Sequence, residues 1–138
     1  MAAARSWLGT PYHPGGRVKG AGVDCLTLLA EVYAEAGVLP RVHVPGYSPD
    51  WHLHRNAERY LEGVTRYADE ITCLPEPADI AVWKFGRCFS HGAIVVSWPL
   101  IIHASTGRPC TQENAQNAQW LSRLPSGKSR PVKFFRVR

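Results

Sequence analysis

The sequence lacks any long run of apolar residues. Its opening stretch, MAAARSWLGTPYHPGG, holds one arginine and no apolar segment of signal-peptide length. No later stretch approaches the roughly 20 residues that a membrane-spanning helix needs. We therefore expect a chain that is made in the cytoplasm without an export signal of its own and that does not insert into a membrane.

Cysteine is sparse as well. The four cysteines stand at the irregular positions 25, 73, 88 and 110, unlike the dense framework of a small secreted scaffold. The spacing leaves room for one or two disulfides, but free thiols are the expected state. Internal repeats and low-complexity tracts are absent. Because 138 residues, 45% of them hydrophobic, are the size of one ordinary domain, we expect residues 1–138 to form a single domain.

Acidic residues are outnumbered by basic ones. The formal charge of +5 and the pI near 9.3 favour an anionic partner, such as nucleic acid, an anionic cell-wall polymer or an acidic peptide, without choosing among them. Part of the excess lies in GKSRPVKFFRVR, whose alternation predicts a final strand with basic residues facing solvent. These residues are not interleaved with aromatics on a recognisable binding module, so no nucleic-acid partner is expected.

An amphipathic helix is predicted in GAGVDCLTLLAEVYAEAGVLP, residues 20–40. It begins at Cys25 and runs to about Ala36, where Gly37 ends it and Pro40 follows. Its apolar positions keep the spacing of one helix face: Cys25, Leu28, Leu29, Val32, Tyr33 and Ala36. The preceding GTPYHPGGRVKGAGV is rich in glycine and proline and predicts an irregular entry loop.

A second helix is predicted in SPDWHLHRNAERYLEGVTRYADEI, with Ser48 as N-cap and Pro49 at the first helical position. One face of it carries Leu53, Ala57, Tyr60, Leu61, Val64, Ala68 and Ile71. The later runs DIAVWKF, HGAIVVS, LIIHAS and KFFRVR predict strands. Helices first and strands after favour an α+β fold, with a small antiparallel β-sheet or half-open barrel packed on the first helix.

Cys25 is the candidate nucleophile. A thiol in the first turn of a helix faces the positive end of the helix dipole, which lowers its pKa and favours the thiolate that attacks carbonyl carbon. The alternative is a small buried apolar residue. The adjacent Asp24 opposes thiolate formation unless its side chain is turned away, for example as the helix N-cap.

Two histidines could supply the base. His91 and His103 flank GAIVVSWPLII, which predicts a β-hairpin. In a hairpin symmetric about Ser97, residue 91 lies opposite residue 103, and directly opposed side chains are close enough for one imidazole to bond the other. One histidine would then be the general base and the other its orienting partner. The alternative is two unrelated histidines with a chance spacing.

A family resemblance rests on these same residues. GVDCLTLLAEVYAEAG, PADIAVWKFGRCFSHGAIVV and IIHAS resemble the motifs of the NlpC/P60 family of papain-like cysteine peptidases, and more narrowly its phage-encoded cell-wall branch. The resemblance runs from Trp7 to about Ser105, and FFRVR at the end also resembles the phage branch. It implies a papain-like fold with N-terminal helices packed on a small antiparallel sheet.

The resemblance implies site residues position by position. Cys25 matches the nucleophile, His91 the general base and His103 the polar residue that orients the base. Tyr12 matches a tyrosine that precedes the nucleophile and points its hydroxyl at the active site. That hydroxyl could help the Cys25 backbone N–H hold an oxyanion.

Asp24 matches an acidic residue that binds the free amino group of substrate in many members. Many members continue D-C-S-G, with the serine also contacting substrate. Here Leu26 follows Cys25, and a leucine cannot supply that hydrogen bond. The usual preference for a stem peptide with a free N-terminal L-Ala is therefore in doubt, whereas the hydrolytic residues are all present.

Metal sites are not expected. His52 and His54 in DWHLH stand two apart on the predicted second helix and so point to different sides. Cys88 and His91 in CFSH have no second pair at zinc-finger spacing.

Arg17 and Lys19 in the entry loop either meet a substrate carboxylate or are simply solvated. The expected activity requires neither a metal nor another cofactor.

The implied activity is hydrolysis of an amide bond in peptidoglycan stem peptides, at a bond following γ-D-glutamyl, through Cys25, His91 and His103. A transamidase or acyltransferase with the same triad is one alternative, and a non-catalytic tail or wall-binding module is another. A CHAP-type amidase is disfavoured by the second histidine. The phage-like resemblance implies a tail protein as partner and a virion-associated enzyme acting on the cell wall.

Overall fold

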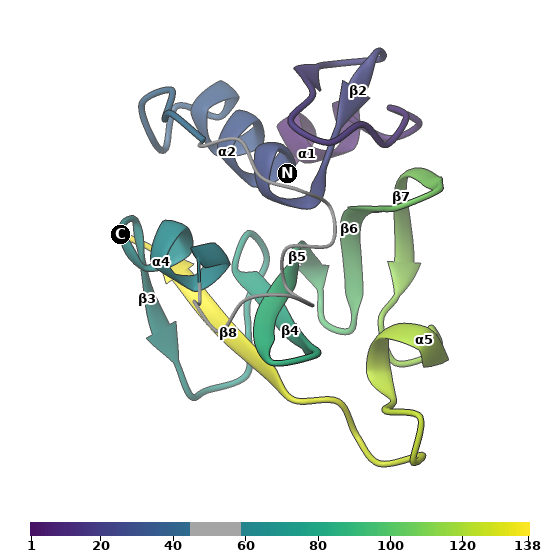
Figure 1. The fold of residues 1–138 in the computed structure, drawn as a ribbon. Helices are drawn as coiled ribbons and strands as arrows, with labels where there is room; N and C mark the ends of the chain where they lie inside the picture. The colour runs from purple at the N-terminus through teal and green to yellow at the C-terminus, as the bar shows by residue number, and fades with distance from the viewer. Residues whose placement is uncertain (45–58) are drawn as a thin grey trace.

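The computed structural model describes residues 1–44 and 59–138 (Figure 1). Its helices are α1 (Ala2–Ser6), α2 (Cys25–Glu35), α4 (Arg59–Thr65) and α5 (Gln119–Ser122). Its strands are β1 (Arg17–Val18), β2 (Gly22–Val23), β3 (Ala68–Ile71), β4 (Ile80–Phe85), β5 (Cys88–Ser97), β6 (Leu100–Ser105), β7 (Arg108–Asn114) and β8 (Val132–Val137). The architecture is the expected α+β fold.

A six-stranded antiparallel sheet forms the centre, with strand order β3-β8-β4-β5-β6-β7. Alternate residues of each strand face opposite sides of the sheet. One side packs against α2 and α4 and contains Val82, Ile94, Ile102 and Phe135. The other side holds Ala81, Trp83, Ala93, Val95, Ile101 and Leu121, the last from α5. Figure 1 shows α2 and α4 beside the sheet and α5 at its β7 end.

Helix α2 matches the prediction to within a residue. Asp24 and Thr27 form a capping box that satisfies the first backbone N–H groups. Its buried face includes Leu28, Leu29, Val32 and Tyr33. Gly37 follows the helix with φ +75°, a conformation that favours glycine. The helix end was therefore readable from the sequence.

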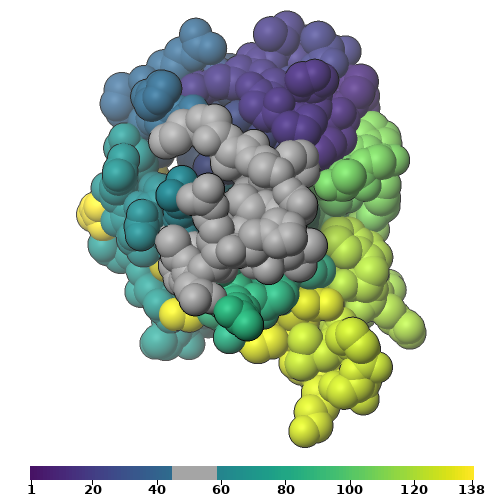
Figure 2. All heavy atoms as spheres, viewed as in Figure 1, coloured from purple at the N-terminus to yellow at the C-terminus, as the bar shows by residue number. Residues whose placement is uncertain are grey.

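The entry loop is more ordered than expected. Helix α1 lies before it, and β1 pairs with β2 in a two-stranded ladder. The backbones at Gly16 and Gly22 lie so close that a side chain at residue 16 would not fit: a Cβ on Gly16 would lie 2.6 Å from the backbone carbon of Gly22. Figure 2 shows this N-terminal region, with α2, along one end of the molecule, and the segment after β7 projecting at the opposite end.

The predicted second helix is wrong beyond Thr65. Helix α4 covers Arg59–Thr65, but the following Ala68–Ile71 is strand β3, paired with the C-terminal strand β8. The apolar residues of this segment do have helical spacing. All four residues of β3 nevertheless pair with β8, and such tertiary pairing overrides the local sequence pattern. The predicted cap Ser48, and the rest of the helix up to residue 58, lie outside the described residues.

The four predicted strands are confirmed as β4, β5, β6 and β8. Strand β7 and the short helix α5 were not predicted. Basic residues in and directly after β8 pair with acidic neighbours: Lys133 with Glu70, Arg136 with Asp79 and Arg138 with Asp69. All four cysteines are free thiols. Within residues 1–44 and 59–138, no helix has the length and apolarity to span a membrane.

Candidate active site

Cys25 is the first residue of α2 and lies against strand β5. Its thiol donates a hydrogen bond to the Ser90 carbonyl oxygen at 3.7 Å. The Tyr60 hydroxyl, from α4, donates to the Cys25 carbonyl oxygen at 2.9 Å. Ser90 directly precedes His91, so the fold brings the candidate nucleophile to the backbone beside the candidate base.

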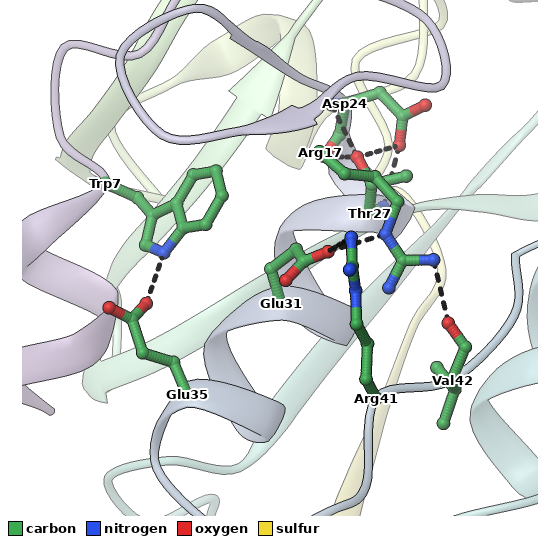
Figure 3. A network of polar contacts seen from close by, with 8 residues as sticks. All are labelled: Trp7, Arg17, Asp24, Thr27, Glu31, Glu35, Arg41 and Val42. Atoms are coloured by element: carbon green, nitrogen blue, oxygen red, sulfur yellow. Dashed lines mark hydrogen bonds and ion pairs between the residues drawn. The ribbon is translucent and has the colours of Figure 1, made fainter.

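Asp24 is buried and acts as the N-cap of α2 (Figure 3). Its Oδ1 accepts hydrogen bonds from the Leu26 and Thr27 backbone N–H groups at 2.9 and 2.8 Å, and from the Thr27 hydroxyl at 3.0 Å. Its Oδ2 accepts from the Gly15 N–H at 2.7 Å. The carboxylate thus ties the entry loop to the helix and fixes the position of Cys25. The Cys25 N–H is not among the donors that this cap engages.

The surroundings of the Cys25 thiol disfavour the thiolate. Burial, followed by the charge of Asp24, raises the pKa of Cys25 to about 12. Hydrogen bonding to the Gly92 backbone and the Tyr60 side chain lowers the pKa by less. The expectation that the helix start favours the thiolate is therefore wrong for the resting protein, because burial and a neighbouring carboxylate outweigh the helix dipole.

His91 and His103 are joined, as the sequence predicts. His91 Nε2 lies 2.8 Å from His103 Nδ1, and both side chains are buried. The expected register is wrong, however. Ile94 pairs with Ile102, and a bulge follows between Val95 and Ser97. Continued along the strands, this pairing makes the histidines diagonal neighbours, which long side chains can still bridge.

The histidine pair continues into a carboxylate and an arginine that sequence reasoning missed. His103 Nε2 lies 2.5 Å from Glu113 Oε1. Arg108 donates to both oxygens of Glu113, from Nη1 to Oε1 at 3.0 Å and from Nη2 to Oε2 at 3.3 Å. Thr106-Gly107 after LIIHAS is a turn signal for the β6–β7 hairpin. The turn alone does not predict the contact, because a bulge between His103 and Ser105 sets the register that brings Glu113 to the face of His103.

The charges of this cluster are set by burial and by its own hydrogen bonds. Burial lowers the pKa of His103, and the bond to Glu113 offsets only part of that effect. For Glu113, burial raises the pKa, but the hydrogen bonds from Arg108 and His103 outweigh it, so the pKa is lowered. His103 is therefore held neutral beside an ionised carboxylate.

Aromatic rings enclose the two imidazoles. Trp120 of α5 lies parallel to His103, with an interplanar angle of 10° and centroids 5.8 Å apart. The His91 ring lies within about 6 Å of Trp83 and Phe85, as well as Trp120. This packing limits the access of water to the hydrogen bonds between the rings.

Tyr12 lies close to the nucleophile. It forms a bridge with Val23, the residue before the Asp24 cap, and is half-buried. Burial raises the pKa of its hydroxyl, and the charges of Cys25 and Asp24 raise it further. A hydrogen bond with Thr106 lowers this pKa in part, and the phenol remains a neutral donor. The role expected for Tyr12 at the oxyanion stays a prediction.

A cavity of about 400 Å³ lies beside this site, between α2, α4 and residues 39–44. Leu26 and Tyr60 line it on the side of Cys25, and Arg59 and Arg66 are among its polar lining residues. Leu26 therefore presents an apolar surface to this space.

The other candidates are not brought together. Arg17 bonds Glu31 and the Val42 carbonyl, and Lys19 bonds Glu35, so both basic residues of the entry loop contact the α2 region (Figure 3 for Arg17). His52 and His54 lie outside the described residues. Across the described ranges, no three histidine, cysteine or acidic side chains are grouped as metal ligands would be.

Comparison with known proteins supports the fold. No protein-family model and no curated protein matches the sequence. Among solved structures, the NlpC/p60 domain of the peptidoglycan hydrolase SagA is similar, with a TM-score of 0.61 and 19% identity over 96% of this chain and 92% of that one. An NLP/P60-family, lipoprotein-like protein from Staphylococcus aureus subsp. aureus Mu50 has a TM-score of 0.57 and 21% identity over 88% of this chain and 37% of that one. The chain therefore has the fold of NlpC/P60 domains.

Proposed function

We propose that this protein is a cysteine peptidase that hydrolyses amide bonds in peptidoglycan stem peptides. The observation that carries the proposal is the position of Cys25 at a capped helix start, against the backbone next to a buried His91–His103 pair. The fold is that of the NlpC/P60 domain of a peptidoglycan hydrolase. The bond following γ-D-glutamyl is proposed from the sequence resemblance.

The reaction begins from a neutral thiol. His91 removes the Cys25 proton as the sulfur attacks the carbonyl carbon, because a thiol with a pKa of about 12 supplies little thiolate at neutral pH. The Cys25 N–H and the Tyr12 hydroxyl donate to the oxyanion. The C–N bond then breaks, and the leaving amine takes the proton from His91. Water attacks the thioester with His91 again as base, which releases the acid and restores the thiol.

Incubation with purified peptidoglycan and soluble stem peptides, followed by mass spectrometry, tests this proposal. Fragments are expected from the wild type and from Cys73→Ala, which removes an exposed thiol in the connection between β3 and β4. None is expected from Cys25→Ala. Fragments from Cys25→Ala would overturn the role of Cys25. Wall binding without fragments would favour a binding module, and products joined to an added amine would favour a transferase.

We also propose that the enzyme works with a phage tail protein and acts on the cell wall from the virion. The support is the resemblance of the cysteine and histidine motifs to the phage-encoded branch of the family. Mass spectrometry of purified particles from a producing strain should detect the chain among tail proteins. Its absence from particles, together with its presence in the cell extract, would contradict this placement.

A further inference from the structure

We propose that Glu113 is a positioning residue that fixes which nitrogen of each histidine carries a proton, so that His91 Nδ1 is the atom that accepts the Cys25 proton. The inference rests on the proposed function for its consequence. The hydrogen-bond arrangement behind the inference is independent of the proposed function, and the tautomers can be measured without any substrate.

The proton positions follow from what each group can donate. An ionised carboxylate only accepts, so the 2.5 Å contact to Glu113 Oε1 requires a proton on His103 Nε2. A neutral imidazole has one N–H, which leaves His103 Nδ1 as an acceptor. The 2.8 Å contact must then be donated by His91 Nε2. Neutral His91 consequently has its lone pair on Nδ1, and Nδ1 becomes the basic nitrogen.

This arrangement fails if His103 is protonated twice. Both of its nitrogens would then donate, His91 Nε2 would have to accept, and the proton of neutral His91 would move to Nδ1. The structure disfavours that state, because His103 is 1% exposed and its pKa is lowered by burial. Arg108 supports the ionised form of Glu113 through two hydrogen bonds. Trp120 stacks on the His103 ring and covers it.

A purely structural role for Glu113 makes a different prediction. Glu113 and Arg108 belong to the same strand, β7, and Glu113 also reaches β6 through His103. If the carboxylate only joined these strands, its removal would lower stability and leave the tautomers of the remaining folded protein unchanged. The tautomer of His91 therefore separates the two roles.

The test is the nitrogen-15 NMR spectrum of the imidazoles in the full chain at neutral pH, for the wild type, Glu113→Gln and Glu113→Leu. In the wild type, both histidines are expected to be protonated at Nε2. Glu113→Leu removes the acceptor of the His103 Nε2 proton. In Glu113→Gln, the side-chain NH₂ must face either His103 or Arg108, where the carboxylate had accepted hydrogen bonds from both. Both changes are expected to raise the population of His91 protonated at Nδ1. Glu70→Gln, on strand β3, is the matched control and should leave the spectrum unchanged.

Kinetics supply the second readout. Glu113→Gln is expected to lower kcat by about 10–100-fold with KM nearly unchanged. This loss is smaller than the one expected from replacing His103, which is bonded directly to the general base His91. Glu113→Asp should restore part of kcat, because it keeps the charge. A wild-type His91 protonated at Nδ1, or tautomers that stay the same in both Glu113 variants, would overturn the inference. An enzyme inactive on every stem peptide, with the expected tautomers, would instead count against the proposed function alone.

Discussion

Asp24 has two opposing effects on the candidate nucleophile. Its carboxylate caps α2 and so places Cys25 at the helix start, yet its charge is the second cause of the raised thiol pKa, after burial. The chain therefore keeps a precise cap at the cost of a less acidic thiol. A base beside the sulfur becomes more important in such a site than in one where the thiolate is already formed.

Asp24→Asn separates these effects. The asparagine keeps Oδ1 as a cap acceptor but removes the charge, so the pKa of Cys25 should fall and its alkylation by iodoacetamide should begin at lower pH. Stability should drop by about 1–3 kcal/mol, because the new NH₂ faces the Gly15 N–H. Quantifying the alkylated Cys25 peptide between pH 6 and about 10 measures the shift, since only the thiolate reacts.

The exposed Cys73 of the same protein is the internal control, and its alkylation profile should be the same in the wild type and the variant. A Cys25 profile that does not move in Asp24→Asn would show that the carboxylate has no electrostatic effect on the thiol. A wild-type Cys25 that is alkylated rapidly at pH 6 would contradict the protonated resting state.

At the scale of elements, the packing of α4 against β5 depends on Gly92 of β5, which faces Tyr60 of α4. A Cβ on Gly92 would lie 2.2 Å from the Tyr60 hydroxyl, which bonds the Cys25 carbonyl. Gly92→Ala should therefore lower the free energy of unfolding by about 1–3 kcal/mol through overpacking. Urea denaturation of the two proteins gives the difference.

Tyr60→Phe provides the comparison, because it removes the clashing oxygen together with its hydrogen bond. Alone it should cost about 1 kcal/mol. Combined with Gly92→Ala, the total loss should be smaller than the sum of the two single losses, since the worst contact is gone. Strictly additive losses would show that the cost of the alanine arises elsewhere.

The sequence predicted correctly those helices and strands whose position depends on capping residues and on the local pattern of apolar residues. The capping box and Gly37 set the two ends of α2, and four strands were predicted from their alternation. Strand β3 was predicted as helix, because Ala68–Ile71 carries helical spacing and only its pairing with β8, more than 60 residues later, makes it a strand. The contact between His91 and His103 was predicted from a regular hairpin register. The actual register differs and contains a bulge that the sequence of the hairpin does not indicate, yet the two side chains still meet.

The missed part of the site has a similar cause. Glu113 and Arg108 join the histidines only through the β6–β7 hairpin, and neither belongs to a motif. For Cys25 the sequence shows two opposing influences on the pKa, the helix start and the charge of Asp24, but not the burial that is the largest cause of its rise. Motifs thus located the candidate residues, while their protonation depends on packing.

On the scale of the whole molecule, the last strand of the chain is an inner strand of the sheet. Strand β8 lies between β3 and β4, and Phe135 on it is fully buried against the α2 side. It pairs with both neighbours, and its residues pack on both sides of the sheet, Phe135 on one side and Val132 and Phe134 on the other. Buried groups on several elements are consequently protected together or exposed together on unfolding.

This cooperativity predicts an alkaline limit to stability. Burial raises the pKa of Cys25 to about 12 and that of Cys110 to about 11, and it raises the pKa of Tyr33 as well. The unfolded chain loses these protons at lower pH than the folded protein does. Above pH 9 the folded state thus binds more protons, and the free energy of unfolding falls as pH rises. Urea denaturation from pH 7 to about 10.5 should show a plateau followed by this decline.

Cys110→Ala shows how much of the decline one buried thiol contributes. It should lower stability by a constant amount at every pH, because a small cavity replaces the sulfur, and it should make the decline above pH 9 shallower by the contribution of Cys110. Cys73→Ala, at an exposed thiol, should change neither the plateau nor the slope. If the wild type kept its full stability above pH 9, or if Cys110→Ala had the wild-type slope, the thiols would not be protonated groups buried in the core. The resting protonation proposed for Cys25 would then lose its physical basis, since the same burial is the cause in both cases.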